Sequence, residues 1–188
     1  MAPISLILLN KLISTGRAAT VWLATLACCS LTSCISSSGP ILGDARAILG
    51  EHIQVHAFGP AKDGPREQTT ATFDWSGSRY VPRGPSDFTE FTIHPYEGRD
   101  LIIQQQAGRT GSRAEYGLAR RIADGVYLII PISEDDADEP TRERFCTKTQ
   151  DASCLITTPE QLFVFARATA ARDEDNGGIA VVVPAARR

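Results

Sequence analysis

The sequence predicts an α+β fold that is mainly an antiparallel β-sheet, a curved sheet or a partial barrel, with one C-terminal α-helix. Two observations lead to this fold class. Between residues 71 and 132, short alternating apolar runs are separated by turn signals, which is typical of strands joined by hairpins. A single strong helix start then follows at Thr158, with a short β-branched run after the helix.

Three hairpins are predicted in chain order. The first is ATFDWSGSRYVP (71–82), with its turn at SGS, and the second is FTEFTIHPYEGRDLIIQQQ (88–106). The third, EYGLARRIADGVYLIIPI (115–132), has the clearest turn, because Asp124-Gly125 tolerates the positive φ of a tight hairpin. Its returning strand is apolar on both faces, so we expect cover on both sides of it.

The helix is predicted from TPEQ (158–161), a capping box with proline at the first helical position. Apolar residues follow at spacings of three and four, and the helix is expected to end near Arg172. IAVVVP (179–184) indicates a last short strand. The segment 41–62 is ambiguous and is interpreted as a short helix followed by a strand.

The first 33 residues differ from the rest of the chain. They contain two basic residues and no acidic one, followed by the apolar run AATVWLATLACCS (18–30). This run is shorter than the roughly 20 residues that span a bilayer and fits the apolar region of a secretory signal peptide. The next four residues, Leu31-Thr32-Ser33-Cys34, resemble the lipobox of bacterial lipoproteins. The alternative is an uncleaved core helix with Cys34 as a buried thiol.

This resemblance implies that residues 1–33 are a lipoprotein signal peptide and that Cys34 carries lipid, because several acyl chains hold a protein stably on a membrane. Residues 34–40 would form a flexible lipidated tether, and residues 41–188 a single β-rich globular domain. In the best-known sorting rule, an aspartate directly after the lipidated cysteine retains a lipoprotein on the inner membrane. Ile35 stands at this position instead, which favours the outer membrane. We expect a lipid-anchored protein of the bacterial cell envelope that faces the periplasm.

The cysteine count fits an oxidising compartment. Cys28 and Cys29 would leave with the leader and Cys34 would carry lipid, so Cys146 and Cys154 remain as a pair. A disulfide between them would close a loop of about nine residues and contribute roughly 2 to 3 kcal/mol to stability. A redox pair and half of a metal site are the alternatives, but the spacing is not that of a thioredoxin-type motif.

Metal sites are weakly indicated. His52 and His56 are four residues apart, yet no H-E-x-x-H arrangement is present, and His94 is distant in sequence. The acidic runs EDDADE (134–139) and DEDNGG (173–178) lack the ligand spacing of a calcium loop and are interpreted as solvated turns. The sequence therefore predicts no metal and no cofactor.

Motifs and charge favour a binding or structural module over an enzyme. The sequence contains no nucleophile elbow, P-loop or Rossmann glycine pattern, so no catalytic residue is assigned. The formal net charge of −3 argues against nucleic acid as a partner, because binding it needs a concentrated basic surface. The aromatic residues with β-periodicity are expected in the core, or else along a groove for a carbohydrate or peptide; they are Trp75, Tyr80, Phe88, Phe91 and Tyr96.

The predicted function is therefore that of a lipid-anchored envelope module that contacts an envelope protein or a glycan. Two alternatives remain. Small β-barrel lipoproteins that block lysozymes have a similar plan, and an acidic domain would suit a basic lysozyme. An envelope hydrolase without a recognisable motif is the other, because catalytic residues can lie far apart in sequence.

Overall fold

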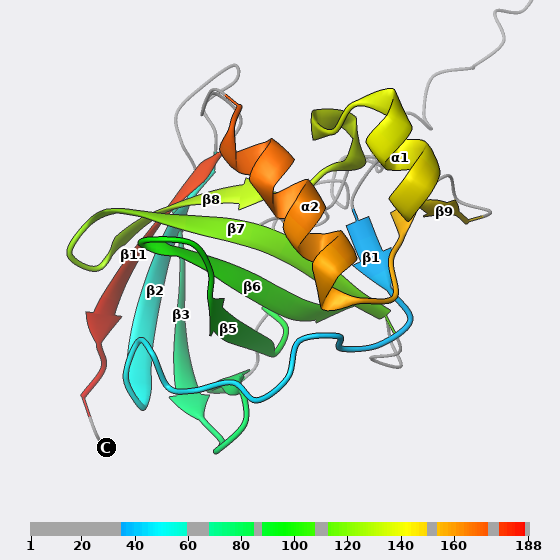
Figure 1. The fold of residues 1–188 in the computed structure, drawn as a ribbon. Helices are drawn as coiled ribbons and strands as arrows, with labels where there is room; N and C mark the ends of the chain where they lie inside the picture. Colours follow the sequence, from blue (N-terminus) through cyan, green and yellow to red (C-terminus); the bar gives the residue numbers. More distant parts are fainter. Residues whose placement is uncertain are drawn as a thin grey trace, which may run out of the picture.

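The computed structural model describes residues 35–59, 68–84, 88–107, 113–149, 154–172 and 177–186. Eight of its strands close into an antiparallel barrel in the order β6-β5-β4-β3-β2-β11-β8-β7, with β6 also paired to β7 (Figure 1). This confirms the predicted fold class. The barrel strands are β2 (His52–Phe58), β3 (Gln68–Trp75), β4 (Tyr80–Pro82), β5 (Phe91–Pro95), β6 (Asp100–Ala107), β7 (Arg113–Ala123), β8 (Val126–Pro131) and β11 (Gly178–Pro184).

Smaller elements cover the outer face of the barrel on one side (Figure 1). β1 pairs with the start of β7, where β8 has already ended, and with β10, which in turn pairs with β9. Helix α2 lies across β7. No helix among the described residues has the length and apolarity to cross a membrane. These elements are β1 (Ile35–Ser37), η1 (Glu134–Asp136), α1 (Glu139–Phe145), β9 (Thr147–Lys148), β10 (Cys154–Leu155) and α2 (Pro159–Ala170).

The local sequence signals explain the best-defined turns and the helix. Gly125 has a φ of +68° between β7 and β8, and a Cβ there would lie 2.6 Å from the Val182 carbonyl oxygen, so the turn requires glycine. Thr158 accepts a hydrogen bond from the Gln161 N–H while the Gln161 side chain bonds back to the Thr158 N–H. The predicted hairpin turn and capping box are both confirmed.

Strand β7 separates two apolar layers. Its even-numbered residues Ala114, Tyr116 and Leu118 face outward and pack with α2. Its odd-numbered residues Glu115 and Gly117 face the barrel interior. The same alternation holds along β6 and β8, because successive side chains of a strand point to opposite faces. The protein therefore has an outer layer between the barrel and α2, and a separate barrel interior.

The structure differs from the sequence prediction at the start of the described chain. Residues 34–40 are predicted as a flexible tether, but Ile35, Ser36 and Ser37 form β1 and are at most 1% exposed. Hydrogen bonding to two neighbouring strands fixes them, and Ile35 packs into the outer layer. The folded domain therefore includes Ile35 and does not begin at residue 41.

Two further differences concern helices. The segment 41–51 contains no helix, and only the predicted strand, β2, follows it. The acidic run 134–139 is not a solvated turn alone, because it forms η1 and begins α1. Asp138 is the N-cap of α1, where its side chain accepts a hydrogen bond from the Thr141 N–H at 3.0 Å.

Candidate functional site

An apolar cavity of about 100 Å³ lies inside the barrel. Seven barrel strands contribute to its wall, and three phenylalanine rings make up much of the lining. Phe73 contacts Phe88 and Phe91 edge to face, with ring centroids 5.8 and 4.9 Å apart. Smaller apolar side chains add to the wall, namely Val55, Ile103, Ile129 and Ala180, and Tyr116 and Gly117 of β7 also border the cavity.

Polar groups sit on one side of this cavity. Gln105 and Glu115 line it beside Thr89, whose hydroxyl accepts a hydrogen bond from the Gln105 amide. Burial raises the pKa of the Glu115 carboxyl above its ordinary value, and nearby Arg113 partly offsets that rise. An apolar wall with a few polar groups is the usual chemistry of a small-molecule site.

The opposite end of the barrel interior is closed. Tyr80 is fully buried there, and its hydroxyl donates to the Gly50 carbonyl at 3.1 Å and accepts from the Leu49 N–H at 3.0 Å. The Tyr80 ring stacks on Phe91 and contacts Trp75 edge to face. Residues just before β2 therefore hold the Tyr80 hydroxyl, and the cavity lies on the other side of Phe91, where Phe73 and Phe88 line it.

The predicted aromatic set therefore divides. Phe88 and Phe91 line the cavity, while Trp75 and Tyr80 pack at the closed end. Tyr96 belongs to the outer layer, where it stacks obliquely on Phe163 and donates a hydrogen bond to the Phe163 carbonyl. Four of the five residues are brought together in one apolar cluster of the barrel.

The three histidines do not form one site. His52 and His56 lie on the outer surface of β2, where Nδ1 of His52 is 2.8 Å from Asp74 and Nδ1 of His56 is 3.0 Å from Thr70. His94 is 8% exposed on β5, with its Nε2 2.9 Å from the Thr92 hydroxyl, and burial lowers its pKa.

Asp74 is the carboxylate that contacts His52. Arg83 donates two hydrogen bonds to it, one at 3.0 Å, and His52 contacts it as well. Together they lower the Asp74 pKa to about 2, with Arg83 as the larger cause. The Asp74 side chain is 40% exposed on the outside of the barrel. This ion-pair cluster braces β2, β3 and the residue after β4.

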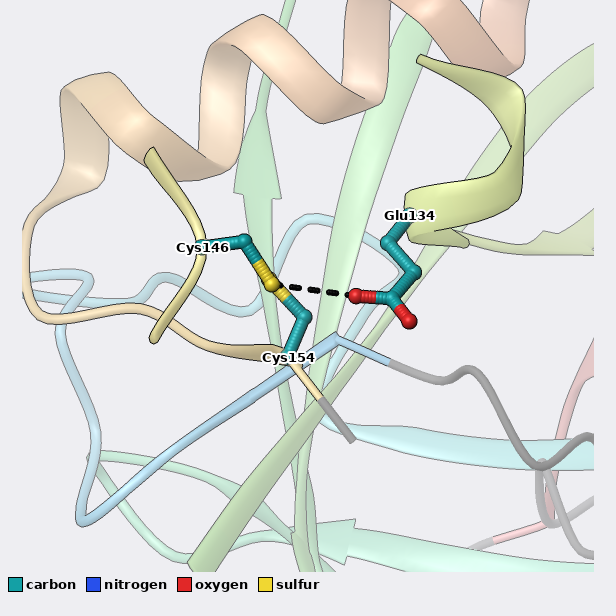
Figure 2. Close-up of side chains that lie close together, drawn as sticks. All are labelled: Glu134, Cys146 and Cys154. Carbon is teal, nitrogen blue, oxygen red and sulfur yellow. Dashed lines mark hydrogen bonds between the residues drawn. A yellow bond between two sulfur atoms is a disulfide. The ribbon is translucent and has the colours of Figure 1, made fainter. Parts of the chain in front are cut away.

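The predicted cysteine pair lies in the outer layer beside a buried carboxylate. Cys146 and Cys154 have Cα atoms 5.1 Å apart, within the range of a disulfide, and the two sulfur atoms are joined (Figure 2). Glu134 points at them from η1, with Oε2 3.0 Å from the Cys146 sulfur. Its other oxygen, Oε1, accepts a hydrogen bond from the Lys148 ammonium group.

These three residues also form a cluster of potential metal ligands. Within the described ranges, the ligand atoms of Glu134, Cys146 and Cys154 all lie within 4.8 Å of one another. Cysteine binds metals as a thiolate, so a metal ion and a disulfide exclude each other here. Lys148 already contributes a positive charge to the carboxylate. Sequence reasoning missed Glu134, because nothing distinguishes it from its acidic neighbours before the fold buries it.

Some predicted features fall outside the described residues. These are the leader 1–33, the lipidation site Cys34, and Asp173 to Asn176 of the second acidic run. Cys34 immediately precedes Ile35, whose register partner in β10 is Cys154.

Comparison with protein-family models, with curated proteins and with solved structures finds no match to this chain.

Proposed function

We propose that this protein is a lipid-anchored module of the bacterial cell envelope that binds a small apolar group inside its barrel. The observation that carries the binding proposal is the cavity lined by Phe73, Phe88 and Phe91. Closed eight-stranded barrels have an interior just wide enough to be filled by side chains or to hold one small ligand. Here the side chains leave space unfilled.

The size of the cavity limits what it can accept. A volume of about 100 Å³ is below the roughly 300 Å³ at which pockets begin to hold a whole drug-sized molecule. It is closer to an engineered apolar cavity of about 150 Å³ that holds benzene. The ligand would therefore insert one ring or a few methylene groups. A hydrogen-bond donor on the same molecule would lie beside Gln105 and Glu115.

The lipid anchor rests on the leader and on Cys34, and the position of β1 adds a consequence. Because Ile35 belongs to a buried strand, the proposed lipid would sit one residue from the folded domain. The module would then lie directly on the bilayer surface, without a tether between them.

The anchor is tested by fractionation of cells that express wild type or Cys34→Ala. Wild type is expected in the membrane fraction with a mass that shows loss of residues 1–33 and gain of lipid. Cys34→Ala is expected to lose both processing and lipid. The anchor would be contradicted if wild type and Cys34→Ala were both unshortened, lay in the same fraction, and differed in mass only by the substitution.

The binding proposal is tested by thermal unfolding in the presence of benzene. At ten times its dissociation constant, a ligand adds about 1.4 kcal/mol to stability, which raises the Tm by about 3–6 °C for a domain of this size. Ala180→Phe should abolish the shift, because Ala180 lines the cavity. The matched control, Val181→Phe, changes the next residue of β11 and should keep the shift. No shift in wild type, or an equal shift in Ala180→Phe, would refute the proposal.

A further inference from the structure

A buried carboxylate, Glu134, lies beside the cysteine pair in the outer layer, and a purely structural disulfide does not require one. The Glu134 side chain is only 5% exposed, and its Oε2 lies 3.0 Å from the Cys146 sulfur (Figure 2). Lys148 bonds to the other oxygen. Buried carboxylate oxygens are normally hydrogen-bonded, because leaving one unsatisfied costs free energy.

Oε2 of Glu134 has a hydrogen-bond donor in only one of the two redox states of the cysteine pair. A disulfide sulfur carries no proton, so the Cys146 contact is not a hydrogen bond while the pair is oxidised. In the dithiol, the Cys146 S–H group donates to Oε2 of Glu134, and hydrogen bonds to charged acceptors are the stronger ones. The position of Glu134 therefore stabilises the reduced form relative to the disulfide.

The two cysteine residues differ in their exposure to solvent. Cys154 is 0% exposed in β10, whereas Cys146 is partly exposed at the C-terminal end of α1. An external thiolate therefore reaches the Cys146 sulfur first. Lys148, with 58% of its side chain exposed, supplies a positive charge beside Glu134 that offsets repulsion of the incoming thiolate.

We propose that the Cys146–Cys154 disulfide is a site of thiol–disulfide exchange with a dithiol reductant, and that Glu134 is a positioning residue for the Cys146 thiol. A thiolate of the reductant attacks the Cys146 sulfur and forms a mixed disulfide, while the bond to Cys154 breaks and Cys154 leaves with the electron pair and is protonated. The second thiolate of the reductant attacks the reductant sulfur of the mixed disulfide. Cys146 leaves, is protonated and donates to Glu134.

The exchange balances in atoms and electrons. The reductant loses two electrons and two thiol protons and becomes a disulfide. Cys146 and Cys154 gain the two electrons and two protons and become thiols. Nothing else is consumed, and the direction depends on the relative stability of the two disulfides.

The proposal is tested by redox equilibrium of the full-length chain. Cys28, Cys29 and Cys34 are replaced by serine in all samples, so that only the pair is titrated. The protein is equilibrated with mixtures of reduced and oxidised dithiothreitol, and free thiols are counted by mass after alkylation. Glu134→Gln should shift the equilibrium about tenfold toward the disulfide, because the acceptor of the Cys146 thiol loses its charge. Asp135→Asn, an exposed neighbour in η1, should leave the equilibrium unchanged.

A second measurement keeps the wild-type Glu134 and so does not depend on how that variant folds. Two further chains each retain one cysteine of the pair, with serine at the other position. The chain that retains Cys146 should react with a soluble aromatic disulfide at least about ten times faster than the chain that retains Cys154, as unequal access requires. Faster reaction of the chain that retains Cys154 would overturn the proposal. So would equal effects of Glu134→Gln and Asp135→Asn on the redox equilibrium with dithiothreitol.

Discussion

The outer layer and the barrel interior share the same strands but are packed to different degrees. In the outer layer, Leu162, Phe165 and Ala166 of α2 are all 0% exposed against residues of β1 and β7. In the barrel interior, Phe88 and Phe91 are only partly buried and border an unfilled cavity. Protein interiors are normally close-packed, so space left beside three phenylalanine rings needs an explanation.

The difference indicates which region determines the fold and which region the proposed ligand would enter. The outer layer is fixed by a capped helix, by the buried strand β1 and by a pair of cysteines. It has the properties of a core that determines the fold. The interior is apolar, partly open and lined on one side by Gln105 and Glu115, which is the chemistry that the proposed binding site requires.

The largest expected effect comes from deleting one ring in each region. Phe165→Ala should lower the free energy of unfolding by about 3–5 kcal/mol, because it opens a void in a closed layer. Phe91→Ala should cost about 1–2 kcal/mol, since its ring is partly exposed and already borders free space. Urea denaturation of both variants measures the difference. Equal losses would mean that the two regions are packed alike.

Enlarging one alanine in each region should give the next largest effect. Ala166→Phe is expected to destabilise the protein by about 1–3 kcal/mol or more, because the outer layer has no room for a ring. Ala180→Phe should cost less than about 1 kcal/mol, because its ring can enter the cavity. Thermal and urea unfolding provide the comparison. A greater loss for Ala180→Phe would show that the cavity cannot accept a ring.

Removing the N-cap of α2 tests whether the stability of the outer layer and binding in the barrel interior are independent. Thr158→Ala should lower stability by about 1 kcal/mol, because the Gln161 N–H loses its side-chain acceptor at the start of α2. Benzene binding should not change, since α2 lies outside the barrel. Thr157→Ala is a neighbouring control that leaves the N-cap side chain in place. Weaker benzene binding in Thr158→Ala would show that the two regions are coupled.

The smallest expected effect concerns the ion pairs outside the barrel. The pKa of Asp74 is lowered from 3.8 to about 2, so its contribution is complete above about pH 4 and is lost as the pH falls toward 2. The side chain is 40% exposed, which limits the contribution to a few tenths of a kcal/mol. Asp74→Asn should flatten the stability profile over this pH window by that amount. A profile that is unchanged relative to wild type would mean that the ion pairs contribute nothing.

Features with a local cause could be predicted from the sequence. The capping box at Thr158 and the Asp124-Gly125 turn depend on residues within a few positions of each other, and both are present as predicted. The apolar alternation correctly indicated that the strand before Ile132 is covered on both faces. Closure of the barrel through pairing of β6 with β7 was compatible with the pattern, because a curved sheet or partial barrel was expected.

Features with a non-local cause could not be predicted. Ser36 and Ser37 look like linker residues, and only their pairing with β7 and β10 makes them a buried strand. Burial of Glu134 depends on the positions of Cys146 and Lys148, which the acidic run does not reveal. The cavity depends on summed side-chain volumes across seven strands. The N-cap at Asp138 is a local signal, but it lies within an acidic run that the sequence analysis interprets as a solvated turn.

The central claim is that the barrel interior, and not the outer layer, accepts an apolar group. Methyl NMR during a titration with benzene tests it most directly, because isoleucine and valine methyl groups report on both regions. The account predicts shifts at Val55, Ile103 and Ile129 of the cavity, with Ile132 and Ile156 of the outer layer unchanged. Shifts confined to the outer layer, or the absence of any shift at saturating benzene, would contradict it.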